Sequence, residues 1–391
     1  MTGSAARAFV LAAAIAAAGG CRRGTSATAT ASGPDGAAPA TAPAPAPAPA
    51  ARRFHRIDVH THIGPDGIPR AIRLMDEWGI DGVVNLSGMY PGPPRGMLET
   101  QLAAAATGRG RIAVFMTPNF KLVRMGKGYG EAMADELTAG HKLGARGLKI
   151  TKGLGLGIPA ADGKHLLPVD DPGLDPLFER AGALGMPVAI HIGDPKAFWK
   201  PVSPDNERWD ELRVHPEWSF YGPGIPSWQQ LYDAFERLVA RNKKTTFIGV
   251  HFGNDPEDPD NVARMLDKHP NFFIDTAARV PEIGRHPQEK MRRFYAKYQD
   301  RVLFGTDTGI GPDDADMMFG STGAAPPTRA DEIRFFTSTW RYFETAERQF
   351  ESPTPIQGRW KIDGVGLSES VLRKIYFDNA ARVLRWRPPG T

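Results

Sequence analysis

The stretch that decides the fold is Ile57–Ile63, which reads Ile-Asp-Val-His-Thr-His-Ile. Its β-branched apolar residues favour a buried strand, and a strand points residues i and i+2 to the same face. His60 and His62 therefore project together, and they face the interior of the fold if Val59 and Thr61 face outward. Two buried imidazoles one pleat apart seldom stay without partners, and a shared metal ion satisfies both acceptor nitrogens at once.

Seven further apolar runs follow this one along the chain. Most are continuously apolar, as expected for strands that are covered on both faces in a parallel sheet. They start roughly 25 to 40 residues apart, except for a gap of about 59 residues between the fifth and the sixth. The eight predicted strands are Ile57–Ile63, 82–87, 112–117, 146–150, 187–192, 246–252, 272–277 and 302–308.

Amphipathic stretches with apolar residues three and four positions apart lie between these runs and predict helices. Ser227 with Gln230 forms a capping-box start, and three helices end at a glycine that suits a left-handed cap, namely Gly79, Gly144 and Gly185. Eight alternating strands and helices predict an α/β protein with one (β/α)8 barrel, a TIM barrel, rather than a doubly wound open sheet. The predicted helices are 69–79, 95–107, 131–143, 174–184, Trp228–Arg241, 262–268, 287–298, 328–348 and 368–386.

The N-terminal region has a different composition from the rest of the 391 residues. Residues 1–21 look like a bacterial lipoprotein signal, because Arg7 precedes a short apolar stretch and small residues lead to Cys21. Lipidation at Cys21 would anchor an exported protein in the bacterial envelope, on the periplasmic side. An ordinary cleaved signal or an incidental cysteine are the alternatives. Cys21 is the only cysteine, so the folded domain has neither a disulfide nor a thiolate ligand.

Residues 22–53 are dominated by Ala, Pro, Thr, Ser and Gly and predict a disordered linker, because they bury too little apolar surface. The barrel domain is therefore expected over residues 54–391. A net charge of +4 is small for this length, and no basic patch is interleaved with aromatic residues. The sequence consequently argues against nucleic acid as a partner and in favour of a small-molecule substrate.

Three further residues of metal-binding types stand at the ends of predicted strands. His191 ends the fifth strand, His251 the sixth and Asp307 the eighth. Barrel active sites lie at the C-terminal ends of the strands, so closure of the sheet would bring these groups to His60 and His62. Nitrogen and oxygen ligands suit Zn, Mn or Fe, and Zn is the default choice.

This set of residues resembles the metal constellation of the amidohydrolase superfamily. Gly305-Thr306-Asp307 and the terminal Asn-Ala-Ala-Arg at 379–382 are similar to the amidohydrolase-2 branch that contains aminocarboxymuconate-semialdehyde decarboxylase. The resemblance covers about residues 57–386 and implies a TIM barrel of the metal-dependent hydrolase type with one divalent metal. The implied ligands are His60, His62, His191 and Asp307.

The resemblance also implies catalytic roles for Asp307 and His251. A divalent metal lowers the pKa of a bound water towards about 7, and Asp307 would take the proton of that water and pass it on. His251 would lie close by, where it hydrogen-bonds the water or polarises the substrate.

Two cationic residues near the predicted strand ends are candidates for substrate binding. Lys149 ends the fourth strand and could bind a substrate carboxylate, become carboxylated and bridge two metals, or extend to solvent. Arg279 follows the seventh strand and suits a carboxylate, although a salt bridge within its loop, for example with Asp275, is an equal alternative. The long fifth connection, 193–227, predicts a lid over the site, or an insertion that packs on the barrel or at the subunit contact of a homodimer.

Three functions fit these features. The first is a metal-dependent hydrolase of a small C–N, ester or lactone substrate, acting through a metal-activated water. The second is a metal-dependent non-oxidative decarboxylase of a carboxylated substrate, which the family branch favours. The export signal favours the hydrolase, because decarboxylases of aromatic catabolism usually serve cytoplasmic intermediates. The third is an exported binding protein on an inactive barrel, against which the complete residue set argues.

Overall fold

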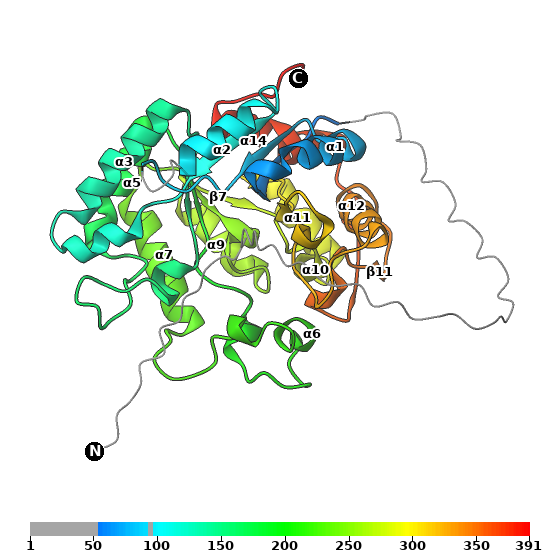
Figure 1. Cartoon of the computed structure of the whole chain (residues 1–391). Helices are drawn as coiled ribbons and strands as arrows, with labels where there is room; N and C mark the ends of the chain where they lie inside the picture. The colour runs from blue at the N-terminus through cyan, green and yellow to red at the C-terminus, as the bar shows by residue number, and fades with distance from the viewer. Residues whose placement is uncertain (1–53, 93–96) are drawn as a thin grey trace, which may run out of the picture.

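The computed structural model describes residues 54–92 and 97–391 (Figure 1). The predicted signal with Cys21, the predicted linker and the first two residues of the predicted helix 95–107 lie outside the described residues. Within the described part of the chain, no helix is both long and apolar enough to cross a bilayer.

A parallel sheet forms the centre of the domain, and from β1 to β8 each strand pairs with the next one along the chain. A short strand, β10 (Met318–Phe319), extends the sheet antiparallel to β9. The parallel strands are β1 (Ile57–Ile63), β2 (Gly82–Asn85), β3 (Ile112–Met116), β4 (Gly147–Ile150), β5 (Val188–Ile190), β6 (Phe247–Gly249), β7 (Phe272–Asp275), β8 (Val302–Leu303) and β9 (Thr308–Ile310).

The sheet closes on itself where the predicted eighth strand returns to β1. That strand is divided into β8 and β9, and β9 pairs parallel with β1. Between β8 and β9, the chain also bonds β1: the Val59 amide donates to the Phe304 carbonyl at 2.9 Å, and the Asp307 amide to the His60 carbonyl at 2.8 Å. These bonds confirm the predicted barrel and exclude the open sheet.

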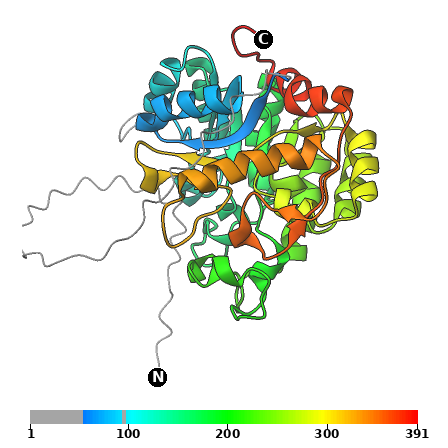
Figure 2. The same cartoon turned by 90° about the vertical axis from the view of Figure 1, so that its right-hand side faces the viewer.

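Helices surround the barrel and agree closely with the predicted ranges (Figures 1 and 2). The predicted glycine caps are confirmed, with positive φ angles at Gly79, Gly144 and Gly185, and Ser227 forms the predicted capping box. The outer helices are α1 (Ile68–Trp78), α2 (Met97–Ala106), α3 (Tyr129–Leu143), α5 (Asp175–Leu184), α7 (Trp228–Arg241), α9 (Pro259–Lys268), α11 (Gln288–Tyr298) and α12 (Arg329–Glu344).

The predicted closing helix 368–386 is shorter and irregular. It consists of α13 (Glu369–Arg373), one π-helical turn and α14 (Asn379–Leu384). Phe377 and Leu384 pack with Ile57 of β1 and with other apolar side chains at the start of the strands. This segment therefore closes the N-terminal end of the barrel with apolar residues.

Candidate metal centre

Left-handed backbone shapes the C-terminal ends of β6 and β8. His251 has a φ of 55° and lies in the turn α8 (Val250–Gly253), and Asp307 has a φ of 63° between β8 and β9. A non-glycine residue with positive φ is uncommon, and such residues cluster at functional sites. The predicted strands 246–252 and 302–308 were therefore too long, because a strand cannot continue through a left-handed residue.

Three potential ligand atoms converge beside β1. Asp307 Oδ1 lies 3.4 Å from His60 Nε2 and 3.5 Å from His62 Nε2, and the three groups lie within 4.8 Å of one another. Two ligands bound at about 2.1 Å to one tetrahedral ion lie about 3.4 Å apart. The spacing of these nitrogen and oxygen atoms therefore fits a divalent metal.

Hydrogen bonds from the far side of each imidazole hold this geometry. His60 Nδ1 lies 2.8 Å from Asp275 Oδ2, and His62 Nδ1 lies 2.9 Å from Ser87 Oγ. A carboxylate only accepts, so His60 donates from Nδ1 and keeps the lone pair of Nε2 on the side of Asp307. Sequence reasoning missed this role of Asp275, although its place at the end of β7 is the signal that marked the other residues.

Asp58 ties β1 to the turn that carries Asp307. Its carboxylate accepts hydrogen bonds from the Thr306 hydroxyl at 2.6 Å, from the Thr306 amide at 3.0 Å and from the His60 amide at 3.0 Å. Burial raises the pKa of Asp58 to about 7, although these hydrogen bonds lower it. This buried carboxyl group fixes the Gly305-Thr306-Asp307 turn beside the two histidines.

The other two histidines stand next to this cluster. The His251 ring lies 4.9 Å from the His60 ring and 4.4 Å from the His191 ring. His251 Nδ1 donates to the Ala277 carbonyl at 2.9 Å, and His251 forms a second convergent set with His60 and Asp275. Among the described residues, His191 joins neither set of convergent atoms; its Nε2 donates to the Gly193 carbonyl at 3.1 Å.

Burial favours the neutral form of all four imidazoles. Burial lowers the pKa of His60 and His251 well below the ordinary value, and it lowers that of His62 and, to about 4, that of His191. The Lys149 ammonium lowers these values further. Since only a neutral imidazole offers a lone pair to a metal, these rings are ready to act as ligands.

Lys149 lies inside the barrel mouth, as predicted for an inward-facing residue. Its side chain is 3% exposed, and its ammonium has no hydrogen-bond partner among the residues that the structure describes. Burial lowers the pKa of Lys149 to about 8, while Asp275 and Asp307 raise it. The alternative in which Lys149 extends to solvent is therefore wrong, because the ammonium is enclosed.

Arg279 is also buried near the strand ends, but its ion pair differs from the example given by the sequence. Its guanidinium lies 3.7 Å from Asp194, whereas Asp275 contacts His60 and the His251 amide. The salt-bridge alternative with Asp275 is thus wrong, since both oxygens of Asp275 are turned to the histidines.

The long connection 193–227 lies at the C-terminal end of the barrel. It carries α6 (Trp209–Leu212), which the figures place at the opposite end of the barrel from α14 (Figures 1 and 2). The buried Arg208 pairs with Glu211 of the same segment at 2.9 Å and with Glu282 on α10 (Val280–Ile283). The location fits the predicted lid, while the ion pair with α10 fits the alternative of an insertion that packs on the barrel.

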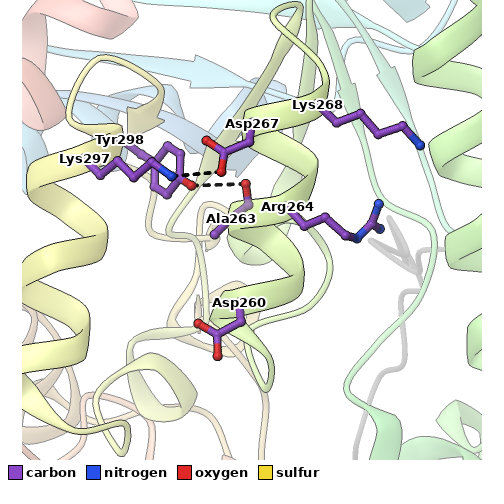
Figure 3. A pocket seen from close by; sticks show the side chains of 7 residues that line it. All are labelled: Asp260, Ala263, Arg264, Asp267, Lys268, Lys297 and Tyr298. Carbon is purple, nitrogen blue, oxygen red and sulfur yellow. Dashed lines mark hydrogen bonds and ion pairs between the residues drawn. The ribbon is translucent and has the colours of Figure 1, made fainter.

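A hollow in the surface lies between α9 and α11, away from the histidine and aspartate side chains at the strand ends (Figure 3). Lys297 pairs with Asp267 at 2.8 Å, and the Tyr298 hydroxyl donates to the Ala263 carbonyl at 3.2 Å. Its charges are paired with neighbouring side chains, and none of its lining residues belongs to the histidine and aspartate sets. This hollow is therefore separate from the candidate metal centre at the strand ends.

The fold and this site together define a barrel with histidine and carboxylate side chains gathered at its C-terminal mouth. The sequence model of the family described as Amidohydrolase matches residues 57–386. The chain therefore belongs to the amidohydrolase family, as the sequence analysis indicated.

Solved structures of similar topology include proteins of two kinds. A 2,6-dihydroxybenzoate decarboxylase from Rhizobium is 17% identical, with 85% of this chain and 99% of that chain covered and a TM-score of 0.48. An amidohydrolase from Burkholderia multivorans with bound HEPES is 14% identical, with 85% and 99% covered and a TM-score of 0.48. No curated protein sequence gives a significant match.

Proposed function

We propose that this chain is a metal-dependent hydrolase that cleaves a C–N, ester or lactone bond in a small substrate. The observation that carries the proposal is the convergence of His60 Nε2, His62 Nε2 and Asp307 Oδ1 at 3.4 and 3.5 Å. These residues and His191 would hold one divalent metal, with Zn as the first choice and Mn or Fe as the others. When bound, the ion polarises a water or a substrate carbonyl oxygen.

Asp307 and His251 are the proposed catalytic residues of the chain itself. The Asp307 side chain is 14% exposed, so that its carboxylate can take a proton from a water and return it to a leaving group. His251 donates from Nδ1 to a backbone carbonyl, which leaves its Nε2 as an acceptor for a water or a substrate hydroxyl.

Lys149 and Arg279 are the proposed substrate-binding residues. A buried ammonium without a partner is costly unless a ligand supplies an anion, and the Lys149 ammonium is near enough to Asp275 and Asp307 for these carboxylates to raise its pKa. Arg279 is 5% exposed and offers a second cation near Asp194. The proposed substrate therefore carries a carboxylate or another anionic group.

The same two cations favour a second candidate, a non-oxidative decarboxylase. A carboxylate that is to be lost must be held beside the ion, and the unpartnered ammonium of Lys149 is placed to pair with it. The resemblance to the amidohydrolase-2 branch is compatible with both hydrolysis and decarboxylation, so an experiment must separate the two reactions.

Incubation of the metal-loaded protein in 18O-labelled water, with a panel of small carboxylated amides, esters, lactones and aromatic acids, tests the proposal. A hydrolase incorporates one labelled oxygen into the organic product, which mass spectrometry detects. Release of CO2 without label in the organic product would replace the hydrolase by the decarboxylase. Binding of panel members without turnover of any would contradict both and support a binding protein.

Export and assembly are also proposals. We propose that Cys21 is lipidated and tethers the barrel to the bacterial envelope through residues 22–53, and that the chain forms a homodimer. Palmitate labelling of the full chain, compared with Cys21→Ser, tests the anchor, and loss of label in the variant is expected. Light scattering of the protein in detergent tests the dimer, which a monomer mass would overturn.

A further inference from the structure

The fourth proposed ligand, His191, has hydrogen-bond partners on the opposite ring nitrogen from the other histidines. Its Nε2 lies 3.1 Å from the Gly193 carbonyl and 3.5 Å from Asp194 Oδ1. Both partners only accept, so Nε2 carries the proton of the neutral ring and Nδ1 keeps the lone pair. In His60 and His251 the arrangement is reversed, because Nδ1 contacts the acceptor.

Asp194 is held rigidly by cations from two other loops. Its Oδ2 lies 2.5 Å from Lys152 Nζ in the loop after β4, and its Oδ1 lies 3.7 Å from Arg279 in the loop after β7. The Asp194 side chain is only 8% exposed. A carboxylate fixed from both sides in this way can fix the ring that it contacts.

The Lys152 side chain also contacts a later part of the connection 193–227. Its ammonium lies 5.8 Å from the centre of the Trp218 ring and 5.7 Å from that of the Phe220 ring, within the range of a cation–π contact. Asp194 lies at the start of the connection 193–227 and therefore stands where the end of β5, the loop after β4 and that connection meet.

We propose that Asp194 is a positioning residue for the metal centre. It holds Nε2–H of His191 on its own side, so that His191 offers Nδ1 to the metal, whereas His60 offers Nε2. This inference rests on the proposed metal centre. It adds that the fourth ligand binds through the other ring nitrogen, and that a residue outside the ligand set selects that nitrogen.

The chain contains a matched control for this role. Asp255 is also fully buried and pairs with a lysine, Lys196, at 2.8 Å, and that ammonium also lies over an aromatic ring, Trp228, at 4.1 Å. The second oxygen of Asp255 accepts from Asn261 at 2.9 Å. Asp255 thus reproduces the buried ion pair of Asp194 without the contact to a histidine.

The test is titration of the metal-free full chain with Co²⁺, read by visible absorption, for wild type, Asp194→Asn and Asp255→Asn. Residues that orient metal ligands typically contribute about 10- to 100-fold in metal affinity. We expect Asp194→Asn to bind Co²⁺ more weakly by that factor with an altered spectrum, and Asp255→Asn to match wild type. Wild-type affinity and spectrum in Asp194→Asn, or tighter binding, would overturn the proposal.

Lys152→Met separates the histidine contact from the ion pair. We expect a smaller loss of affinity than in Asp194→Asn, because the carboxylate stays beside His191 and keeps its ion pair with Arg279. Equal loss in Lys152→Met and Asp194→Asn would overturn the proposal, since the ion pair and not the histidine contact would then be responsible. If wild type itself binds no Co²⁺, the proposed metal centre fails, which is a different result from an unaffected variant.

A measurement on the unaltered protein is independent of how the variants fold. Nitrogen-15 NMR of histidine-labelled, metal-free protein distinguishes the two neutral tautomers, and comparison with His191→Gln assigns the signal. We expect the Nε2–H form for His191 and the Nδ1–H form for His60. The Nδ1–H form at His191 would overturn the inference.

Discussion

The two ends of the barrel both bury side chains, but those at the N-terminal end are apolar and those at the C-terminal end are polar or charged. At the N-terminal end, Phe377 and Leu384 pack against Ile57 and other apolar side chains. At the C-terminal end, the same strands finish in imidazoles, carboxylates and an enclosed ammonium, with left-handed backbone at His251 and Asp307. One end lowers the free energy of the fold, and the other holds groups that the fold alone does not require.

Each end also contains a buried cationic side chain, Arg56 or Lys149, and the two differ in their partners. Near the N-terminal end, Arg56 donates to Glu344 at 2.8 Å and lies 4.2 Å from the centre of the Trp340 ring. Near the C-terminal end, the Lys149 ammonium has no hydrogen-bond partner in the described part of the chain. The fold gives Arg56 an ion-pair partner, although its Nε has no hydrogen-bond partner among the described residues, whereas the whole ammonium of Lys149 lacks one, as the proposed substrate-binding role requires.

The largest effect on the chemical end is expected from Asp307→Asn. Loss of a positioned proton acceptor typically lowers kcat by about 10²- to 10⁴-fold, with a smaller change in KM. Steady-state kinetics on the substrate found by the labelling experiment measure both constants. The exposed Asp316 in the following loop provides the control, Asp316→Asn, which should leave kcat unchanged. An unchanged kcat in Asp307→Asn would remove it as the proton carrier.

The apolar end should respond in stability and not in chemistry. Leu384 is 4% exposed, and truncation of a buried leucine typically lowers the free energy of unfolding by about 2–5 kcal/mol. Urea unfolding of Leu384→Ala measures this loss, and the folded variant should keep the metal content of wild type. A variant that loses its metal while fully folded would break the division between the two ends.

The two buried cations should differ when each is replaced by methionine. Arg56→Met removes the cation that pairs with Glu344, whose carboxylate keeps the hydrogen bond from the Tyr376 hydroxyl, and should lower the free energy of unfolding by about 1–3 kcal/mol. Lys149→Met in metal-free protein removes a buried ammonium that has no hydrogen bond, so the free energy of unfolding is expected to stay the same or to rise. Urea unfolding compares the two, and a larger loss in Lys149→Met would mean that the fold does require that cation.

The sequence predicts the fold of this molecule more completely than it predicts the contacts of the candidate site. Strand positions follow from continuous apolar runs, and the range of β1 is predicted to the residue. The ends of β6 and β8 are not predicted, because no local sequence pattern indicates that His251 and Asp307 adopt left-handed backbone. His60, His62 and Asp307 meet as the resemblance implies.

The contacts beyond those residues could not be predicted. Asp275 and Asp194 each contact a histidine that is distant in sequence or across a turn, and no periodicity marks such pairs. The partner of Arg279 was missed for the same reason, since loop geometry decides which carboxylate it meets.

The smallest effect is expected from pH. A metal competes with protons for imidazole nitrogens, and burial lowers the pKa of His60, His62 and His191, the last to about 4. Protons therefore compete only well below about pH 6.5, the ordinary histidine value. Equilibrium dialysis against Zn²⁺ between about pH 7.5 and 6 should show less than about a tenfold loss of affinity. A steeper fall over that range would show that the imidazoles take up protons as exposed histidines do.

The most direct test is elemental analysis of the protein purified without chelator, for wild type and for the double variant His60→Ala and His62→Ala. One divalent ion per chain is expected in wild type and none in the double variant, while His141→Ala on the exposed face of α3 should match wild type. Two ions per chain would instead assign Lys149 to a bridging role. Full metal content in the double variant, or none in wild type, would contradict the account.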